Sequence, residues 1–322
     1  MPSVSAPNEE FLTKRFLIPK MYEIMNPLLA WTDIFPQVKA TAPVVAYKQE
    51  STSDANDTKK QRPKLMTTSG QWTYVSISQF TQKAANLNKR GFAIKIDQDA
   101  LDYVEGVDEI QRALRKTGFW IAEDYNTRIS DEILASGTAL AGDWSPSAVW
   151  SDANAAPIAD LEDLEDCFIR EGYPYRLTDV FIHKDNFKEL KKYLTSLDIN
   201  QYKQENLYGT PNNGKRDSIE IPVVGTTVHR LLSGVAEGSI IAIDRNNPGM
   251  TIFYNQSPRY SAMNGTYETI VNGQKVSKSL SYGFNMNKYF DNETHETVIQ
   301  LWYDNAPVTI EPYALATDTN SI

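Results

Sequence analysis

The sequence predicts an α+β fold in a flat, extended subunit whose main element is one very long helix. Between residues 97 and 137, apolar residues recur at steps of three, four and once seven, the spacing of a single helical stripe. A helix of about 40 residues would be roughly 50–60 Å long, more than the diameter of a small domain. The stripe consists of Leu101, Val104, Val107, Ile110, Leu114, Ile121, Tyr125, Ile129 and Ile133.

Residues 1–42 are predicted to form an arm, because prolines interrupt them too often for a long helix. Apolar anchors alternate with these prolines and need a surface on which to pack; a neighbouring subunit is one candidate. The prolines are Pro2, Pro7, Pro19, Pro27 and Pro36, and the anchors are Phe11, Phe16, Met21, Leu28, Trp31 and Phe35.

Residues 43–80 have the pattern of a strand, a polar tip and a second strand. Residues 44–47 and 72–77 are β-branched and aromatic, as in strands. The tip, residues 50–64, is too polar to be buried and therefore projects. Two interpretations stay open for it: a disordered surface loop, or a long two-stranded arm that reaches over a neighbouring subunit.

Helix-end signals bound the long helix. Asp97 and Asp99 lie where acidic side chains favour a helix N-terminus, and Gly137 is suited to the position after a C-terminus. Gly106 and Gly118 lie inside the helix and each cost about 1 kcal/mol relative to alanine. A bend at these two glycines is therefore a hypothesis of the sequence.

An α/β unit and then a strand-rich region follow. Residues 158–171 and 184–196 have helical patterns, with a strand at 178–182 between them. Beyond residue 196 the chain is mostly strand and turn. The predicted strands cover residues 219–224, 238–244, 251–254, 296–303 and 307–310, and the tight turns are at Asn264-Gly265 and Asn272-Gly273.

Several residues have the types, but not the spacing, of a chemical site. Residues 209–216 match a phosphate-binding loop until Arg216, where the motif requires Ser or Thr, so we interpret them as a solvated turn. The acidic residues between 160 and 166 lack the order of a calcium loop and are interpreted as a charged helix start. Cys167 is the only cysteine and is interpreted as a small buried apolar residue.

The three histidines are the remaining candidates for catalytic residues or metal ligands. His183, His229 and His295 lie far apart and are interpreted as isolated surface or strand-end residues. We therefore predict no catalytic residue, no cofactor-binding residue and no metal ligand, and we do not expect an enzyme.

Composition limits the possible partners. The 322 residues carry a net charge of -9, which excludes a basic reader of nucleic acid but leaves an acidic wall around packed DNA open. No apolar run approaches the ~18 residues of a membrane span, and the N-terminus does not resemble a signal peptide. A soluble protein made in a cytosol is expected.

Taken together, the order of elements resembles the major capsid proteins of tailed double-stranded DNA viruses, which have the Hong Kong 97-type fold. Residues 155–161 followed by 175–183 look like that family's peripheral-domain helix and strand. Residues 223–228 through 237–244 are similar to the entry of its axial domain.

The resemblance implies an α+β, Hong Kong 97-like capsid fold made of five parts. These are an N-terminal arm (1–42), an E-loop (43–80), a P-domain (81–198) with the spine helix at about 97–137, an A-domain (199–290), and a return strand to the P-domain with the C-terminal tail (291–322).

It also implies a major capsid protein that self-assembles, as hexamers and pentamers, into the icosahedral head of a tailed bacteriophage or archaeal virus. Portal, scaffolding and decoration proteins would be partners, and packaged DNA would be contacted non-specifically, with no membrane and no cofactor. The protein would belong to the virion and assemble in the host cytoplasm. Lys59, Lys60 and Lys64 lie where some relatives cross-link, but solubilising lysines are expected there.

Two other functions stay open. An encapsulin-type nanocompartment shell has the same fold, although the proline-broken N-terminus argues against the amphipathic helix that holds cargo there. A two-domain hydrolase or ligand-binding protein would instead have a deep pocket gathering His183, His229 or His295 with carboxylates.

Overall fold

The computed structural model describes the residues that form most of the predicted elements. They are residues 17, 20–21, 24–25, 28–32, 34–50, 81–97, 106–139, 144–168, 175–196, 218–221, 224–231, 234–255, 261–262, 266–271, 274–279, 283–291, 293–318 and 322. The predicted loop at 51–64, the predicted strand at 72–77, the segment 209–216 and the turn residues Asn264, Gly265, Asn272 and Gly273 lie outside them.

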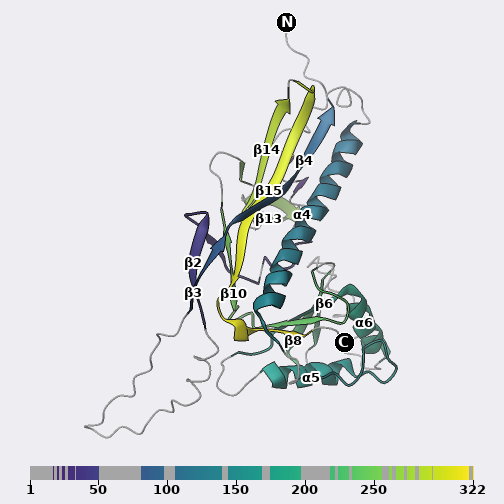
Figure 1. Ribbon diagram of the computed structural model, residues 1–322. Helices are drawn as coiled ribbons and strands as arrows, with labels where there is room; N and C mark the ends of the chain where they lie inside the picture. Colours follow the sequence, from purple (N-terminus) through teal and green to yellow (C-terminus); the bar gives the residue numbers. More distant parts are fainter. Residues whose placement is uncertain are drawn as a thin grey trace, which may run out of the picture.

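One helix, α4 (Gly106–Ser136), runs along the molecule as the sequence predicts (Figure 1). Its stripe is buried from Ile110 to Ile133, with every predicted apolar residue in that range at most 3% exposed. Gly137 follows the last helical residue, and its N–H donates to the carbonyl of Ile133 at 2.7 Å. At about 1.5 Å per residue, the 31 residues of α4 span roughly 46 Å.

The predicted start of this helix near Asp97 is wrong. Residues Asn88–Asp97 form strand β4, and Asp97 pairs with Glu296. Phe92, Ile94 and Ile96 are large apolar residues at every second position, which is the period of a strand and not of a helix. The first described residue of α4 is Gly106, so this glycine lies at the described end of the helix.

The first sheet is built around one long strand, β15 (Glu296–Thr309). The described strands have the order β1 (Gln37–Lys39), β10 (Met250–Tyr254), β15, β14 (Phe284–Asp291) and β11 (Ser261–Ala262), with β4 paired to β15 as well. Helix α4 lies against this sheet beside β4 and β15 (Figure 1).

Strand β15 joins the two strands predicted at 296–303 and 307–310, in spite of Pro307. Pro307 pairs with Ile252, whose N–H donates to the carbonyl of Pro36 on the other side, at 3.0 Å. The backbone of Pro307 therefore faces away from β10, on the side where β4 pairs only as far as Asn305. A proline is tolerated there because no ladder hydrogen bond is lost.

The second sheet has α5 (Pro157–Phe168) and α6 (Lys184–Ser196) packed on one face. Val180 and Ile182 point to these helices, whereas Phe181 between them joins the core around α4. The described strand order is β5 (Thr138–Ala139), β16 (Leu315–Asp318), β9 (Ile240–Ile243), β6 (Asp179–His183), β8 (Thr226–Leu231) and β7 (Ser218–Ile221).

Two hairpins complete the described strands. Strand β2 (Val44–Gln49) pairs with β3 (Thr81–Asn86), and β12 (Thr266–Val271) pairs with β13 (Gln274–Ser279). In the second hairpin Val271 lies opposite Gln274, so the predicted turn at Asn272-Gly273 is flanked by paired strands. A short 3-10 helix, η3 (Pro312–Ala314), precedes β16. Among the described residues, no helix is both long and apolar enough to cross a membrane.

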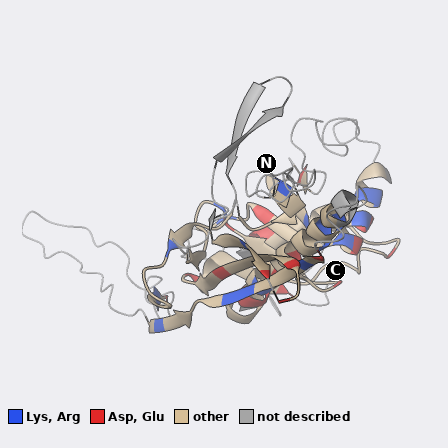
Figure 2. Ribbon diagram, turned by 90° about the horizontal axis from the view of Figure 1, so that it is seen from above, with Lys and Arg blue, Asp and Glu red and all other residues tan. Residues whose placement is uncertain are grey.

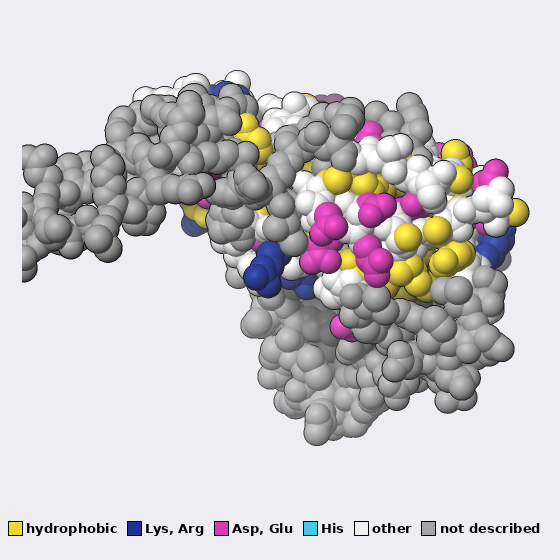
Figure 3. All heavy atoms as spheres, turned by 90° about the horizontal axis from the view of Figure 1, so that it is seen from below, with side chains coloured by type: hydrophobic (Ala, Val, Ile, Leu, Met, Phe, Trp, Pro, Cys, Tyr) yellow, Lys and Arg dark blue, Asp and Glu magenta, His cyan; other side chains and the backbone are white. Residues whose placement is uncertain are grey.

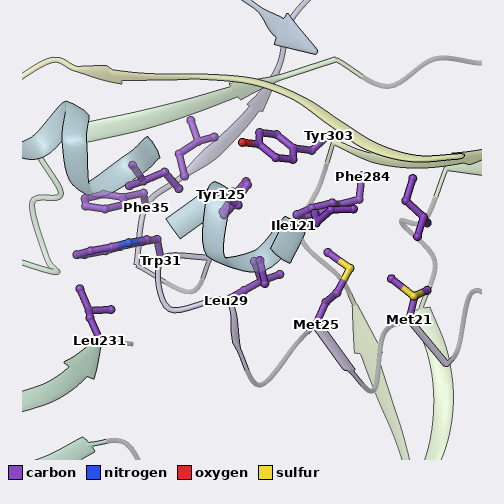
Figure 4. Close-up of a cluster of buried hydrophobic side chains, with 14 of the residues drawn as sticks. Met21, Met25, Leu29, Trp31, Phe35, Ile121, Tyr125, Leu231, Phe284 and Tyr303 are labelled. Atoms are coloured by element: carbon purple, nitrogen blue, oxygen red, sulfur yellow. The ribbon is translucent and has the colours of Figure 1, made fainter. Parts of the chain in front are cut away.

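The anchors of the N-terminal arm pack on their own chain, so a neighbouring subunit is the wrong surface for those that are described. Met21, Trp31 and Phe35 are at most 3% exposed and belong to the core between α4 and the two sheets (Figure 4). Leu28 packs partly buried against the same core. The two remaining anchors, Phe11 and Phe16, lie outside the described residues.

Candidate functional site

The structure places the three histidines in separate surroundings. His183 ends β6 and lies 3.3 Å from the carboxylate of Asp185, while His295 precedes β15 with a φ of 53° and packs against the ring of Phe290. Across the described part of the chain, no three His, Cys, Asp or Glu side chains form a group that could hold a metal ion. An open depression on α6 is lined by Lys188, Lys191, Lys192 and Thr195, and not by these histidines.

His229 is not an isolated histidine, contrary to the sequence interpretation. Its Nε2 lies 2.6 Å from Oδ1 of Asp179, and Nη2 of Arg245 donates to the same oxygen at 2.6 Å. Burial alone would raise the pKa of Asp179, but the hydrogen bond and charge of His229 and the charge of Arg245 lower it overall. The ring of His229 stacks on Phe181 at 4.6 Å. This cluster ties β6, β8 and the segment after β9 together.

Asp160, from the acidic run, also has a defined structural task. It lies in the first turn of α5, as predicted, and its side chain is buried. Its two carboxylate oxygens accept from the Ser147 backbone N–H at 2.8 Å and from Trp150 Nε1 at 2.9 Å. Asp160 therefore holds the preceding loop against the helix. Cys167 packs against the same core but is only half-buried, so its interpretation as a small buried apolar residue is confirmed only in part.

A polar joint fixes α4 to the first sheet. Arg90 on β4 donates to Oδ1 of Asp124 at 2.9 Å, and the hydroxyl of Tyr303 on β15 donates to Oδ2 of the same carboxylate. One turn further along, Arg128 Nη1 donates to Asn305 Oδ1 at 3.0 Å. Burial and the neighbouring Asp124 carboxylate raise the pKa of Tyr303. These hydrogen bonds therefore fix the position of α4 relative to the first sheet.

A second joint lies where the chain leaves β2. The backbone N–H of Glu50 donates to the carbonyl of Ile310 at 2.8 Å. The hydroxyl of Tyr175 lies 3.1 Å from Glu311 Oε2 and 3.5 Å from Glu50 Oε2. Burial raises the pKa of Tyr175, and the two carboxylates raise it further. The root of the predicted E-loop is therefore held to the end of β15 and to the segment before β6.

A third joint holds the N-terminal arm on α4. The side chain of Asn126 accepts from the Ala30 N–H at 3.2 Å and donates to the Leu28 carbonyl at 2.7 Å. A Cβ added to Gly118 would lie 2.8 Å from Cγ2 of Ile24 and 3.2 Å from Cε of Met21. The seven-residue step in the apolar stripe thus marks where the arm approaches the helix backbone.

Replacing Gly118 by leucine is expected to lower the free energy of unfolding by about 2–3 kcal/mol, because the larger side chain overpacks the contact with Ile24 and Met21. Chemical denaturation of the unassembled subunit measures this change. Ala135→Leu is the matched control, because Ala135 is exposed on the same helix and should tolerate leucine within about 0.5 kcal/mol. Equal effects of the two substitutions would contradict the contact at Gly118.

Most of these joint residues could not be found from the sequence. Asn126, Asp124 and Glu50 are ordinary polar residues there, and their partners lie at sequence separations from 34 (Arg90 to Asp124) to 260 (Glu50 to Ile310). Gly118 carried a signal, because it lies within the long step of the stripe, but this glycine was interpreted as the site of a bend and not as a contact with the arm. The joints fix α4 to the first sheet, the arm to α4, and the chain at Glu50, where the predicted tip begins, to the end of β15. They do not assemble a catalytic group.

Comparisons with known proteins agree on one class. The family described as "Phage capsid protein" matches residues 81–316. No curated protein sequence matches the chain.

Three solved structures illustrate the likeness of fold. A virus-like particle from Pyrococcus furiosus is 10% identical, with 95% of this chain and 99% of that chain covered and a TM-score of 0.54. The capsid of Cyanophage P-SCSP1u is 10% identical, covering 90% and 87%, with a TM-score of 0.52. The capsid of an empty GTA particle is 11% identical, covering 92% and 90%, with a TM-score of 0.52.

Proposed function

This chain belongs to the phage capsid protein family, and we propose that it is the major capsid protein whose copies assemble, as hexamers and pentamers, into an icosahedral head around double-stranded DNA. Its fold is the α+β, Hong Kong 97-like capsid fold. The observation that carries the proposal is the family match itself, because residues 81–316 include α4 and most strands of both sheets.

The joints described above suit a structural role. Shell subunits transmit load between neighbours, and a helix fixed to a sheet by Asp124 and Arg128 resists bending better than a helix held by apolar packing alone. We assign α4 as the spine. Closed symmetry then repeats each small contact many times, so weak contacts suffice for a stable particle.

We propose that the parts predicted from the sequence apply to this chain. Residues 1–42 form the arm and 43–80 the E-loop, and the P-domain and A-domain follow with their limit near residue 199. The second sheet pairs β6, before that limit, with β8 and β9, after it. In this division the two domains share one sheet, so the limit marks a change of role and not a separate core.

The proposed partners follow from the same role. Copies of this chain are the main partner, and portal, scaffolding and decoration proteins would join them in the virion, with assembly in the host cytoplasm. The net charge of -9 suits an inner wall that contacts packaged DNA non-specifically without retaining it. A structural and non-enzymatic protein is the proposal.

Deleting residues 51–64 is expected to reduce the assembled fraction about tenfold or more, because the projecting loop would lose its contacts with neighbouring subunits. Glu50 is kept, because it contacts Ile310 and Tyr175. Sedimentation velocity and electron microscopy measure assembly.

A linker of glycine and serine of equal length in place of residues 51–64 is the control, because it keeps the connection between β2 and β3 while removing the side chains. Both variants should retain the melting temperature of the dilute subunit within a few degrees. Normal assembly of both variants would contradict the role given to the loop.

A further inference from the structure

Three aromatic side chains are exposed together on the flank of α4 and β4. Phe92 is 42%, Phe119 41% and Trp120 48% exposed, and the rings of Phe92 and Trp120 lie 5.8 Å apart. Strand β4 pairs only with β15 among the described strands, so it lies at an edge of the first sheet. Large aromatic side chains are enriched at protein interfaces, and a cluster this exposed marks an interaction surface.

Positive charge continues this surface along the helix. Arg112, Arg115 and Lys116 are exposed, and the four-residue steps from Arg112 through Lys116 to Trp120 place them on one side of α4. None of them pairs with a carboxylate of the described residues. We call the surface made of Phe92, Arg112, Arg115, Lys116, Phe119 and Trp120 the aromatic–basic face. The helices at the right of Figure 2 carry several of the blue Lys and Arg residues.

A surface of complementary character lies on α5. Glu162, Asp163 and Asp166 are exposed on that helix, and Val149 is 53% exposed on the loop that Asp160 holds against it. Figure 3, seen from below, shows acidic side chains gathered beside hydrophobic ones at the end of the molecule where α5 lies. We call the surface made of Val149, Glu162, Asp163 and Asp166 the acidic–apolar face.

The two faces do not meet within one chain. Trp120 lies 16 residues before Ser136, so about 24 Å of helix separates it from the lower end of α4, near which α5 lies (Figure 1). Arginine with aromatic residues on one face, and carboxylates with an exposed valine on the other, complement each other in both charge and apolar area. Because the faces differ, a contact between them joins copies head to tail, the arrangement that closes into rings.

We infer that the aromatic–basic face of one subunit docks on the acidic–apolar face of a second copy. This inference rests on the proposed self-assembly and names a contact that drives it. Phosphate groups of packaged DNA would meet the three basic residues, but they would not account for the three exposed aromatic rings beside them.

Charge exchange between the faces tests the contact. The first variant carries Arg112→Glu, Arg115→Glu and Lys116→Glu, and the second carries Glu162→Lys, Asp163→Lys and Asp166→Lys. Each alone places like charges opposite each other and should reduce the assembled fraction about tenfold or more. The third variant combines all six substitutions, restores opposite charges across the contact, and should recover at least half of the wild-type assembled fraction.

A control separates this contact from a general effect of charge. Lys184→Glu, Lys188→Glu and Lys192→Glu change the net charge as much as the first variant does, on exposed positions of α6, where no described residue is a large exposed hydrophobic. This control should assemble like the wild type. Circular dichroism of each dilute subunit checks that all four variants are folded.

The outcomes separate the inference from the proposed function. Loss of assembly in both single-face variants with recovery in the combined variant supports the contact. No recovery in the combined variant, or equal loss in the α6 control, overturns it while wild-type assembly leaves the proposed function standing. Particles that assemble from the first variant but fail to retain DNA would assign the basic residues to the genome and also overturn it. A wild-type chain that never assembles would overturn the proposed function itself.

Discussion

Replacing Trp31 by alanine is expected to lower the free energy of unfolding of the subunit by about 3–5 kcal/mol, the usual cost of removing a buried tryptophan. Trp31 is fully buried, and its ring centroid lies 4.3 Å from that of Phe181 and 5.7 Å from that of Phe35. The contact with Phe181 joins the N-terminal arm to β6 of the second sheet, and the contact with Phe35 lies within the arm. Urea denaturation of the dilute, unassembled subunit measures the loss.

Trp31→Phe is the matched control for this substitution. It keeps an aromatic ring against Phe181, and the indole N–H that it removes has no hydrogen-bond acceptor within the described residues. We expect a loss of about 1–2 kcal/mol, since a smaller ring leaves a small cavity. A loss below about 1 kcal/mol for Trp31→Ala would mean that the arm does not pack on its own chain.

Replacing Gly91 by alanine is expected to destabilise the subunit by about 3 kcal/mol or more. A Cβ at this position would lie 2.2 Å from the carbonyl oxygen of Leu301 and 2.4 Å from Cβ of Trp302. Both belong to β15, which also pairs with β10 and β14 and therefore cannot shift alone. The added methyl group has to displace β4 from β15 and disturb the joint at Arg90.

Ala93→Ser on the same strand is the control, because Ala93 already has a Cβ and is exposed. We expect it to change the free energy of unfolding by less than about 0.5 kcal/mol. Hydrogen exchange of the β4 amides should become faster in Gly91→Ala and stay unchanged in Ala93→Ser. Unchanged protection in Gly91→Ala would contradict the close pairing of the two strands.

The sequence predicted the elements that have a strong local period. The buried stripe of α4 and the bounds of α6 (Lys184–Ser196) match the prediction, and the predicted strand at 178–182 is confirmed as β6. The two helices repeat their apolar residues at helical spacing, and β6 is a short continuous apolar run, which is typical of a strand buried on both faces.

Other elements depend on contacts that no local pattern encodes. Strand β3 is mostly polar and exposed, and it is ordered by pairing with β2, so its sequence resembles a loop. Strand β4 has large apolar residues at every second position, Phe92, Ile94 and Ile96. The acidic residue Asp97 was nevertheless interpreted as the start of the long helix, so this strand was not predicted. Strand β15 passes through Pro307 because no backbone hydrogen bond to β10 is needed there.

The contacts of the N-terminal arm and of His229 also depend on residues that are distant in the sequence. The sequence indicated that the N-terminal anchors need a surface, and for the described anchors this surface is the core of the same chain, where the arm contacts Gly118 and Asn126. The tie of His229 to Asp179 joins neighbouring parallel strands 50 residues apart, which spacing alone does not reveal. The family resemblance supplied what these local patterns could not, the overall plan of a shell subunit.

Electron microscopy of the purified full-length chain under assembly conditions tests the central claim most directly. We predict closed icosahedral shells, or free hexamers and pentamers of one thin tile with α4 as its long axis, and DNA-filled heads with tails when the chain comes from an infected host. Small shells that hold a protein cargo and no DNA would point to a nanocompartment instead. A chain that remains a monodisperse monomer at all concentrations and salt conditions would contradict the account.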